Sequence, residues 1–342
     1  MSRWGGGSFA VCIDVAARPF DQARRLIFKG LGAPVRPLLR SRETRIAVLG
    51  AGGITLIWVL AVMAPLWLLA VAPLVWGVPH LVADVRYLVV RPGLHRQLRL
   101  VAFTAPPLAL AALGAGVFAG VAACAGVILA APASSNRSRL AWLALALVTA
   151  AAWFLGPARN LVFAHLHNVI AIGLWWLWRP RSRRLHYLPL ALVAIGAALI
   201  FTGTLDEWAW SWGAFDHLPT KHLPLGSFVG ELSPGVPAPW GARLVMSFAF
   251  LQSVHYLIWL RMIPDEAHPR ETPRSYRQSL RTLRTELGSV CLGVAIALAL
   301  GIALWGVFDL ANARTGYLRL ALFHGHLEIA ALTWLWLRKG AL

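Results

Sequence analysis

The 342-residue sequence is poor in charged residues, and especially in acidic ones. Charged side chains make up 13% of it, and 14 Asp and Glu stand against 32 Lys and Arg, for a formal net charge of +18. Soluble domains carry about 25% charged and about 45–50% apolar residues, whereas this chain is 58% hydrophobic with a mean hydropathy of +0.64. The composition therefore argues against a soluble globular enzyme, a disordered chain and a collagen-like chain.

Cysteine and the common nucleotide motifs are also scarce. The three cysteines, Cys12, Cys124 and Cys291, are widely spaced and odd in number, which excludes a disulfide framework and a cysteine-type zinc site. There is no Walker loop, no GxGxxG-type fingerprint opening a βα unit and no His-Glu-x-x-His. Nucleotide chemistry and zinc-dependent hydrolysis thus lack their usual signatures.

Long apolar runs fill most of the chain. A membrane-spanning helix needs about 20 mostly apolar residues, and these runs lack the period-two alternation of barrel strands. The sequence predicts an all-α fold, a polytopic membrane bundle of about ten transmembrane helices. The ten stretches are 46–62, 66–90, 100–116, 117–132, 140–156, 161–178, 186–203, 241–262, 286–308 and 318–337.

The basic residues predict how this bundle is oriented. Residues 1–45 contain nine Lys and Arg, and most later clusters fall on the same side if ten helices alternate: Arg91 to Arg99, Arg137 and Arg139, Arg179 to Arg184, Arg261 to Arg284, and Arg338 with Lys339. This is the positive-inside pattern. It predicts a bacterial-type inner (plasma) membrane protein with both termini cytoplasmic, and it accounts for most of the positive charge without nucleic acid.

Two segments flank or interrupt the predicted bundle of residues 46–342. Residues 1–45 form a basic cytoplasmic segment, in which 17–31 are either an amphipathic helix on the membrane surface or a basic tail. Residues 204–240 form a long outer loop rich in Trp and Pro. This loop is either an interfacial flap or a cover over an opening in the bundle.

Six of the eleven histidines lie inside predicted spans. Polar side chains at membrane depth are costly and usually face the bundle interior. We interpret the six as metal ligands, with a proton or substrate relay and structural hydrogen bonding as the alternatives. The predicted ligands are His80, His165, His167, His255, His324 and His326.

Counting residues from the helix ends predicts two layers of histidine. The His-x-His pairs 165/167 and 324/326 lie about 8–13 Å below the outer edge, and His80 and His255 lie about 22 Å below it. Residues two apart on a helix point about 200° away from each other. Each pair therefore serves two centres, or binds with one member while the other supports it, or sits where the helix is opened.

Carboxylates and amides accompany these histidines at helical spacing. Asp84 is four residues after His80, and Glu328 is four after His324, so each pair shares a face. We predict that Asp84 and Glu328 are catalytic, as ligands, orienting groups or proton relays. Alternatively, Asp84 pairs with Arg86. Asn168 and Gln252, one turn from His165 and His255, are predicted cofactor-binding residues.

The histidine helices occur twice in the same order. AHLHNVIAIGLWWLWR (164–179) resembles FHGHLEIAALTWLWLR (323–338), and each is preceded by a single-histidine segment, VPHLVADVRYL (78–88) and SVHYLIWLRMI (253–263). This order is typical of a parallel internal duplication, with half-repeats 66–179 and 241–338. It would bring four ligand-bearing helices around one centre.

Two short motifs resemble known families. GVPHLVAD (77–84) resembles the Gly-x-Pro-His-x-x-x-Asp motif of the Brp/Blh family of bacterial membrane β-carotene dioxygenases. That resemblance implies a polytopic fold, His80 as an iron ligand with Asp84 beside it, and oxidative cleavage of a carotenoid double bond. AHLHNVIAIG (164–173) is similar to the Ala-His-x-His helix of haem–copper oxidases, in which the two histidines bind different haems.

These observations lead to one functional hypothesis and two alternatives. The hypothesis is an integral-membrane, histidine-ligated iron oxidoreductase that uses O₂ on a lipophilic substrate, of carotenoid or isoprenoid type by the resemblance. Non-haem iron is favoured over haem, and copper or zinc also suits such ligands. The alternatives are a haem-binding electron-transfer protein or oxidase relative, and a transporter coupled to protons or metal ions.

Overall fold

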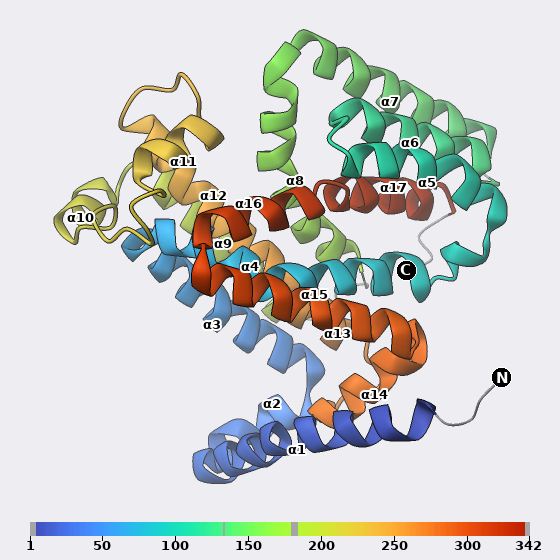
Figure 1. The fold of residues 1–342 in the computed structure, drawn as a ribbon, viewed down its shortest axis with the longest axis vertical. Helices are drawn as coiled ribbons and strands as arrows, with labels where there is room; N and C mark the ends of the chain where they lie inside the picture. Colours follow the sequence, from blue (N-terminus) through green and yellow to red (C-terminus); the bar gives the residue numbers. More distant parts are fainter. Residues whose placement is uncertain (1–4, 133, 179–183, 339–342) are drawn as a thin grey trace.

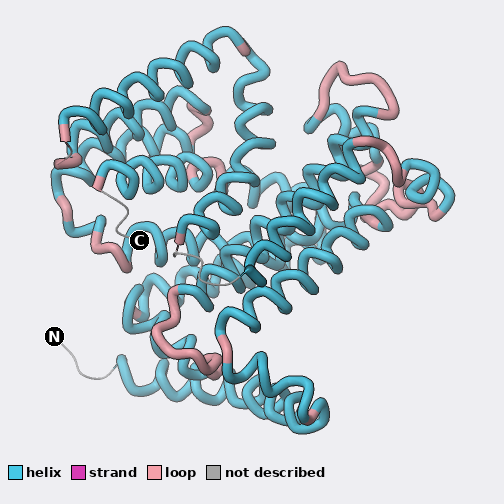
Figure 2. Tube along the Cα trace, turned by 180° about the vertical axis from the view of Figure 1, so that it is seen from behind, coloured by secondary structure: helices cyan, strands magenta, loops and turns pink. Residues whose placement is uncertain are grey.

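A computed structural model describes residues 5–132, 134–178 and 184–338. All regular structure in these three ranges is helical, as Figure 2 shows, so the predicted all-α class is confirmed for the part of the chain described. The basic residues Arg3, Arg179, Arg181, Arg183 and Lys339 lie outside the described residues, as does the end of the predicted bundle at 339–342.

Seven helical segments of the described chain are long and apolar enough to cross a membrane. They agree with seven of the ten predicted stretches, so the chain has the character of a multi-pass membrane protein. The segments are α3 (Arg42–Met63), α4 (Pro65–Asp84) continued by the π-helix η2 (Val85–Val90), α8 (Arg159–Leu177) preceded by the 3₁₀ turn η4 (Gly156–Ala158), α9 (Tyr187–Phe201) preceded by the 3₁₀ turn η5 (Arg184–His186), α12 (Trp240–Leu257) continued by the π-helix η6 (Ile258–Met262) and α13 (Ile263–Glu266), α15 (Ser289–Phe308), and α16 (Leu310–Leu320) with α17 (His324–Leu337).

The other three predicted stretches are helices of a different kind. α5 (Leu98–Ala112) and α6 (Val117–Ala130) have only 15 and 14 residues, fewer than the about 20 that a span requires. Between them the chain turns at Gly114 and Gly116, whose φ angles of 94° and 69° suit glycine. α7 (Ser135–Phe154) is longer, but Arg137 and Arg139 lower the hydropathy of its first turn. Together with α17, these helices form the layer at the upper right of Figure 1.

The most buried spans lie at the centre of the bundle. α12 packs against α3, α4, α8 and α9, and α4 also packs against α15 and α16. In the apolar windows of these spans, 72% of the α12 segment and 61% of the α4 segment is buried, compared with 11% for α15. α4 and α12, the two single-histidine helices, are therefore core elements, and α15 is an outer helix.

Basic residues gather at one end of the bundle, which we call the basic end. Here α1 (Gly5–Leu31) packs against α14 (Tyr276–Leu287), and α2 (Arg36–Arg40) leads into α3 (Figure 1). Residues 17–31 are helical within α1, which favours the predicted amphipathic helix over a tail. The Asp21 carboxylate accepts hydrogen bonds from the backbone N–H groups of Tyr276 and Arg277, which fixes α1 to the start of α14.

The acids of the basic end are paired with arginines. Asp265 binds the buried Arg45 at 2.8 and 3.0 Å, and Glu286 binds Arg86 at 2.5 Å and Arg91 at 3.0 Å. Burial raises the pKa of the Glu286 carboxyl, but the hydrogen bonds and charges of the two arginines outweigh this, and its pKa is lowered overall. Arg86 therefore pairs with Glu286, and the predicted alternative pairing with Asp84 is wrong.

The long loop 204–240 lies at the opposite end of the bundle (Figure 1). It contains α10 (Asp206–Ser211) and α11 (Leu225–Leu232), and Phe228 and Leu232 of α11 are buried in the main core. Arg314 of α16 binds Glu231 at 2.9 Å and donates to the backbone oxygen of Leu69. The loop is thus a packed cap on this end of the bundle.

Candidate metal centre

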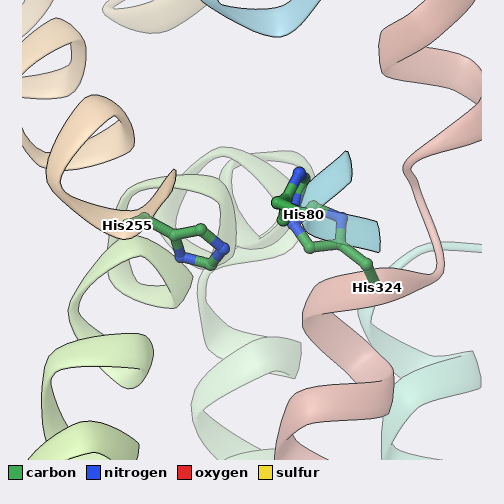
Figure 3. A group of neighbouring side chains, drawn as sticks. All are labelled: His80, His255 and His324. Carbon is green, nitrogen blue, oxygen red and sulfur yellow. The ribbon is translucent and has the colours of Figure 1, made fainter. Parts of the chain in front are cut away.

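Four histidines from four helices meet inside the bundle. The ligating atoms of His80 (α4), His255 (α12) and His324 (α17) lie within 4.8 Å of one another, and Figure 3 shows the three side chains converging from separate helices. The ring of His167 (α8) lies 5.4 Å from that of His255 and 5.1 Å from that of His324, centre to centre. We call His80, His167, His255 and His324 the histidine cluster.

Each His-x-His pair gives one member to this cluster and directs the other elsewhere. His165 bonds the backbone oxygen of Leu232 at 2.8 Å and packs on Phe248, while His326 stacks on Phe163 with ring centres 4.3 Å apart. The predicted opposite orientation of residues two apart is confirmed. The cluster uses the second histidine of the first pair and the first of the second pair, so the two sequence repeats are not in register at the ligands.

The predicted separation into two histidine layers is wrong. His324, assigned to the outer layer, touches His80 and His255, assigned to the inner one. Depth counting assumed straight helices with a common tilt, but α8 and α17 run in clearly different directions in Figure 1. In addition, the chain is not helical at 321–323, so His324 is the first residue of α17. The chain is thus interrupted immediately before the ligand, but only His324 of its pair lies in the cluster, so the predicted opening that would let both histidines bind one ion is not what the structure has.

Glycines bring the ligand helices close together. A Cβ at Gly325, between the two histidines of α17, would lie 3.3 Å from the His167 side chain. A Cβ at Gly77 of α4 would lie 2.3 Å from the ring of Tyr317. Because Tyr317 is 1% exposed, its ring has little room to move aside. The glycine of the GVPHLVAD motif therefore allows Tyr317 of α16 to reach the neighbouring His80.

The hydrogen bonds of the rings leave nitrogens available for a metal. Nδ1 of His167 bonds the backbone oxygen of Ala164 at 2.7 Å, and Nδ1 of His324 bonds that of Ala321. Nδ1 of His80 meets the hydroxyl of Tyr317 at 3.3 Å. A backbone carbonyl on Nδ1 fixes the tautomer in which Nε2 is unprotonated and able to ligate.

Two buried carboxylates lie against the cluster. Oδ2 of Asp84 is 3.8 Å from Nε2 of His80, which confirms the predicted shared face. Oε1 of Glu328 is 3.4 Å from Nε2 of His255, and it accepts a hydrogen bond of 2.7 Å from the Trp259 indole N–H. Both carboxylates are 0% exposed. Glu328, expected beside His324, thus contacts a histidine of another helix.

Several polar atoms at this place are buried without a hydrogen-bond partner. They are Nε2 of His80, both ring nitrogens of His255, both carboxylate oxygens of Asp84 and Oε2 of Glu328. A buried charge is costly unless it is paired, and the arginine nearest to Asp84 in sequence is bound to Glu286. A divalent cation among these nitrogens and oxygens would satisfy the unpartnered atoms and balance two carboxylates, so the residues fit a metal ion.

The ring spacing favours a single ion over a haem. The contacts among the four imidazoles have centre-to-centre distances of 4.9, 5.1, 5.3, 5.4 and 5.7 Å. Imidazoles in edge-to-face contact with one another suit the ligation of one shared ion, whereas a haem separates its axial ligands by the plane of the macrocycle. Imidazole nitrogen and carboxylate oxygen are ligands that suit iron, copper and zinc.

The remaining predicted site residues lie around the cluster. The side-chain amide of Asn168, 1% exposed, donates to the backbone oxygen of Ala164, which also holds His167. Gln252 is buried on α12 one turn before His255. Their predicted cofactor role remains a prediction.

Three residues of the site were not predicted: Tyr317, Trp259 and Tyr256. Trp259 is four residues after His255, so the spacing rule that found Asp84 would also have found it. Tyr256, whose ring is 4.7 Å from that of His80, directly follows His255 in the chain. Tyr317 had no sequence signal, because it reaches His80 only through the packing of α16 on α4.

Comparison of the chain with protein-family models, curated proteins and solved structures finds no match. The case for a function accordingly rests on the cluster and its surroundings.

Proposed function

We propose that this chain is an integral-membrane oxidoreductase built around a non-haem iron ion held by the histidine cluster. The observation that supports this most strongly is the convergence of His80, His255 and His324 beside Asp84 and Glu328, whose buried oxygens include three without a partner. The finer predictions, about ten transmembrane helices, a duplicated bundle and a bacterial-type inner membrane with cytoplasmic termini, belong to the same proposal.

The residues have distinct roles in this proposal. His80, His167, His255 and His324 hold the ion. The rings of His167 and His324 are oriented by donating from Nδ1 to the backbone oxygens of Ala164 and Ala321, and that of His80 by its hydrogen bond with the Tyr317 hydroxyl. Asp84 and Glu328 balance its charge or take up a proton, and Trp259 positions Glu328. Bound iron would supply redox chemistry with O₂ at open coordination positions.

The substrate class follows from where the cluster lies. The helices that carry the four histidines belong to apolar spans, and the spans with His80 and His255 are 61% and 72% buried. A substrate reaching this depth passes through lipid or apolar side chains, which favours a lipophilic molecule over a polar metabolite. A carotenoid or isoprenoid-like chain is the specific proposal, supported by the resemblance of GVPHLVAD to the Brp/Blh motif.

One experiment tests the metal and its type together. The full chain is purified in detergent, and metal content and absorption spectrum are measured on the same sample. We expect about one iron per chain and no Soret band, with the iron lost in His80→Ala and His255→Ala variants that still elute as folded protein. A Soret band would replace the proposal by the haem alternative, and copper or zinc in place of iron would refute the iron assignment.

A second candidate, transport of a metal ion, is favoured by one observation. The span containing α16 and α17 is interrupted at 321–323, immediately before a cluster ligand, and interrupted helices form the ion sites of many transporters. Transport predicts metal flux into vesicles that contain the protein, abolished by His324→Ala. Flux without any turnover of O₂ would select this candidate over the oxidoreductase.

A further inference from the structure

A second site opens at the basic end, and its inner end reaches Val78, Pro79 and Trp259, beside the histidine cluster. A cavity of about 920 Å³ opens between α1, α3, α4, α14, α15 and the η6–α13 segment. This volume is at the upper end of the about 300–1,000 Å³ typical of small-molecule sites. Its walls are mainly apolar and include Ile27, Leu49, Val82 and Ile296.

The charged side chains of the wall are mostly cationic. Five guanidinium groups line the cavity, from Arg24, Arg45, Arg86, Arg261 and Arg274, and the one acidic residue of the lining is Asp265. That carboxylate is shared between Arg45 and Arg261. Glu286, which pairs with Arg86, is shared with Arg91. Arg24 lies 4.0 Å from the Asp21 carboxylate. Three acids thus face six arginines, and the cavity carries an excess of positive charge.

Some of this cationic hydrogen-bonding capacity is unused. Arg86 is only 8% exposed, and its Nη2 is buried without a hydrogen-bond partner. Nε of Arg24 also lacks a hydrogen-bond partner. Arg274 donates to Nδ1 of His268 at 3.1 Å and has no carboxylate among its hydrogen-bond partners in the described chain. Burial and the nearby charge of Arg91 lower the pKa of Arg274, as expected where cations crowd without enough anions.

The apolar wall has the depth of one membrane leaflet. Along α15 the cavity is lined from Leu292 to Ala299, and along α4 from Val78 to Tyr87. At 1.5 Å per residue these stretches rise about 10 Å and about 14 Å. Half of the hydrocarbon core of a bilayer is about 15 Å thick. The cavity therefore runs from the basic surface to near the middle of the bilayer.

From these features we propose that the basic-end cavity binds a membrane phospholipid with an anionic head. Arg24, Arg86 and Arg274 receive the phosphate, and the apolar faces of α4 and α15 receive an acyl chain. Arginine binds phosphate oxygens through paired, charge-assisted hydrogen bonds. Basic pockets between transmembrane helices are a recurrent setting for anionic head groups. The arginines that receive the phosphate are separate from the proposed metal ligands, although the inner wall shares Trp259 with the metal site.

The test is native mass spectrometry of the delipidated full chain titrated with phosphatidylglycerol, phosphatidylcholine or inorganic phosphate. We expect the anionic lipid to bind at least about tenfold more tightly than the zwitterionic one, because both carry the phosphate but the quaternary ammonium of phosphatidylcholine is repelled by the excess arginine charge. Arg274→Gln and Arg24→Gln should each lower that preference about tenfold. Arg99→Gln, a basic residue outside the cavity lining, is the matched control.

A third variant tests the part of the cavity that is proposed to bind the acyl chain. Ala295→Trp fills the apolar wall and should weaken both lipids without changing their ratio. Equal binding of the two lipids would overturn the proposal. So would an equal loss of the preference for the anionic lipid in Arg274→Gln and Arg99→Gln. Inorganic phosphate that displaces phosphatidylglycerol completely would show a soluble anion as the occupant and also contradict it. Iron content, measured on the same samples, should not change, so failure here is separable from failure of the metal proposal.

Discussion

The two polar regions of the molecule balance their buried charge in different ways. At the basic end, Asp265 and Glu286 each bind two arginines. At the bundle centre, Asp84 and Glu328 are fully buried, and their neighbours are histidines, which can be neutral, and not arginines, which are always charged. Since a buried carboxylate needs a cation or a proton, this difference supports the proposed metal ion at the bundle centre. In the proposed function, the acids paired with arginine stabilise the fold, and the two acids beside the histidines balance the charge of the metal ion.

The largest expected effect is on a paired acid. Asp265→Asn leaves the buried Arg45 without its carboxylate, and breaking a buried pair in this way costs about 3–5 kcal/mol of unfolding free energy. Metal content should be unchanged. Thermal unfolding of the detergent-solubilised variant measures the loss, with Asp14→Asn, at the exposed pair with Arg281, as the control. A variant as stable as wild type would remove the contrast between the two regions.

The unpaired acids should behave in the opposite way. Asp84→Asn combined with Glu328→Gln should weaken metal binding more than about a hundredfold, given that even residues outside the ligand shell contribute tenfold to hundredfold. The metal-free variant should be as stable as the metal-free wild type or more so, because two buried charges are gone. Chelator competition and unfolding of the metal-free proteins provide the two measurements. Destabilisation of the metal-free variant would mean that these acids are structural.

Substitution of Gly77 tests the contact between Tyr317 and His80. Gly77→Ala places a methyl group 2.3 Å from the buried Tyr317 ring, and such overpacking costs about 1–3 kcal/mol. The displaced hydroxyl should also weaken metal binding. Gly173→Ala is the control, since nothing lies within 4 Å of its added Cβ. Equal behaviour of the two variants in unfolding and metal-binding assays would rule out a specific role for Gly77.

The smallest effect expected is a dependence of stability on pH at the basic end. The Glu286 pKa is lowered in the folded chain, so its pairing stabilises the fold above the usual glutamate pKa and is lost as pH falls through the lowered value. Between about pH 5 and pH 3, wild type should lose about 1 kcal/mol more than Glu286→Gln. Unfolding measured at both pH values checks this, and parallel curves would contradict it.

Much of the fold could be predicted because hydrophobic length is a local property. The seven spans appear where the apolar runs are long. The stretch 100–132, which has no polar break, divides at Gly114 and Gly116 into two helices shorter than a usual span. The predicted count of about ten treats each apolar stretch as a straight, full-length crossing, and the structure does not confirm it for this stretch.

The residues of the candidate site could be predicted from the sequence better than their relative positions in the fold. His80 and Asp84 share a face because both lie on one regular helix, and the two His-x-His pairs divide because helical geometry separates residues two apart. The contact of Glu328 with His255, and the single level of the cluster, depend on helix tilt and on the opening at 321–323. Neither property is encoded in residue spacing, so neither followed from the sequence.

The most direct test of the metal centre uses the histidine pairs as their own controls. Iron bound per chain is measured for His324→Ala against His326→Ala, and for His167→Ala against His165→Ala, after folded protein has been isolated for all four. Within each pair the two residues share a helix, and one member lies in the cluster. The account predicts loss of iron in His324→Ala and His167→Ala, with iron retained in His326→Ala and His165→Ala. Equal iron within both pairs would contradict it.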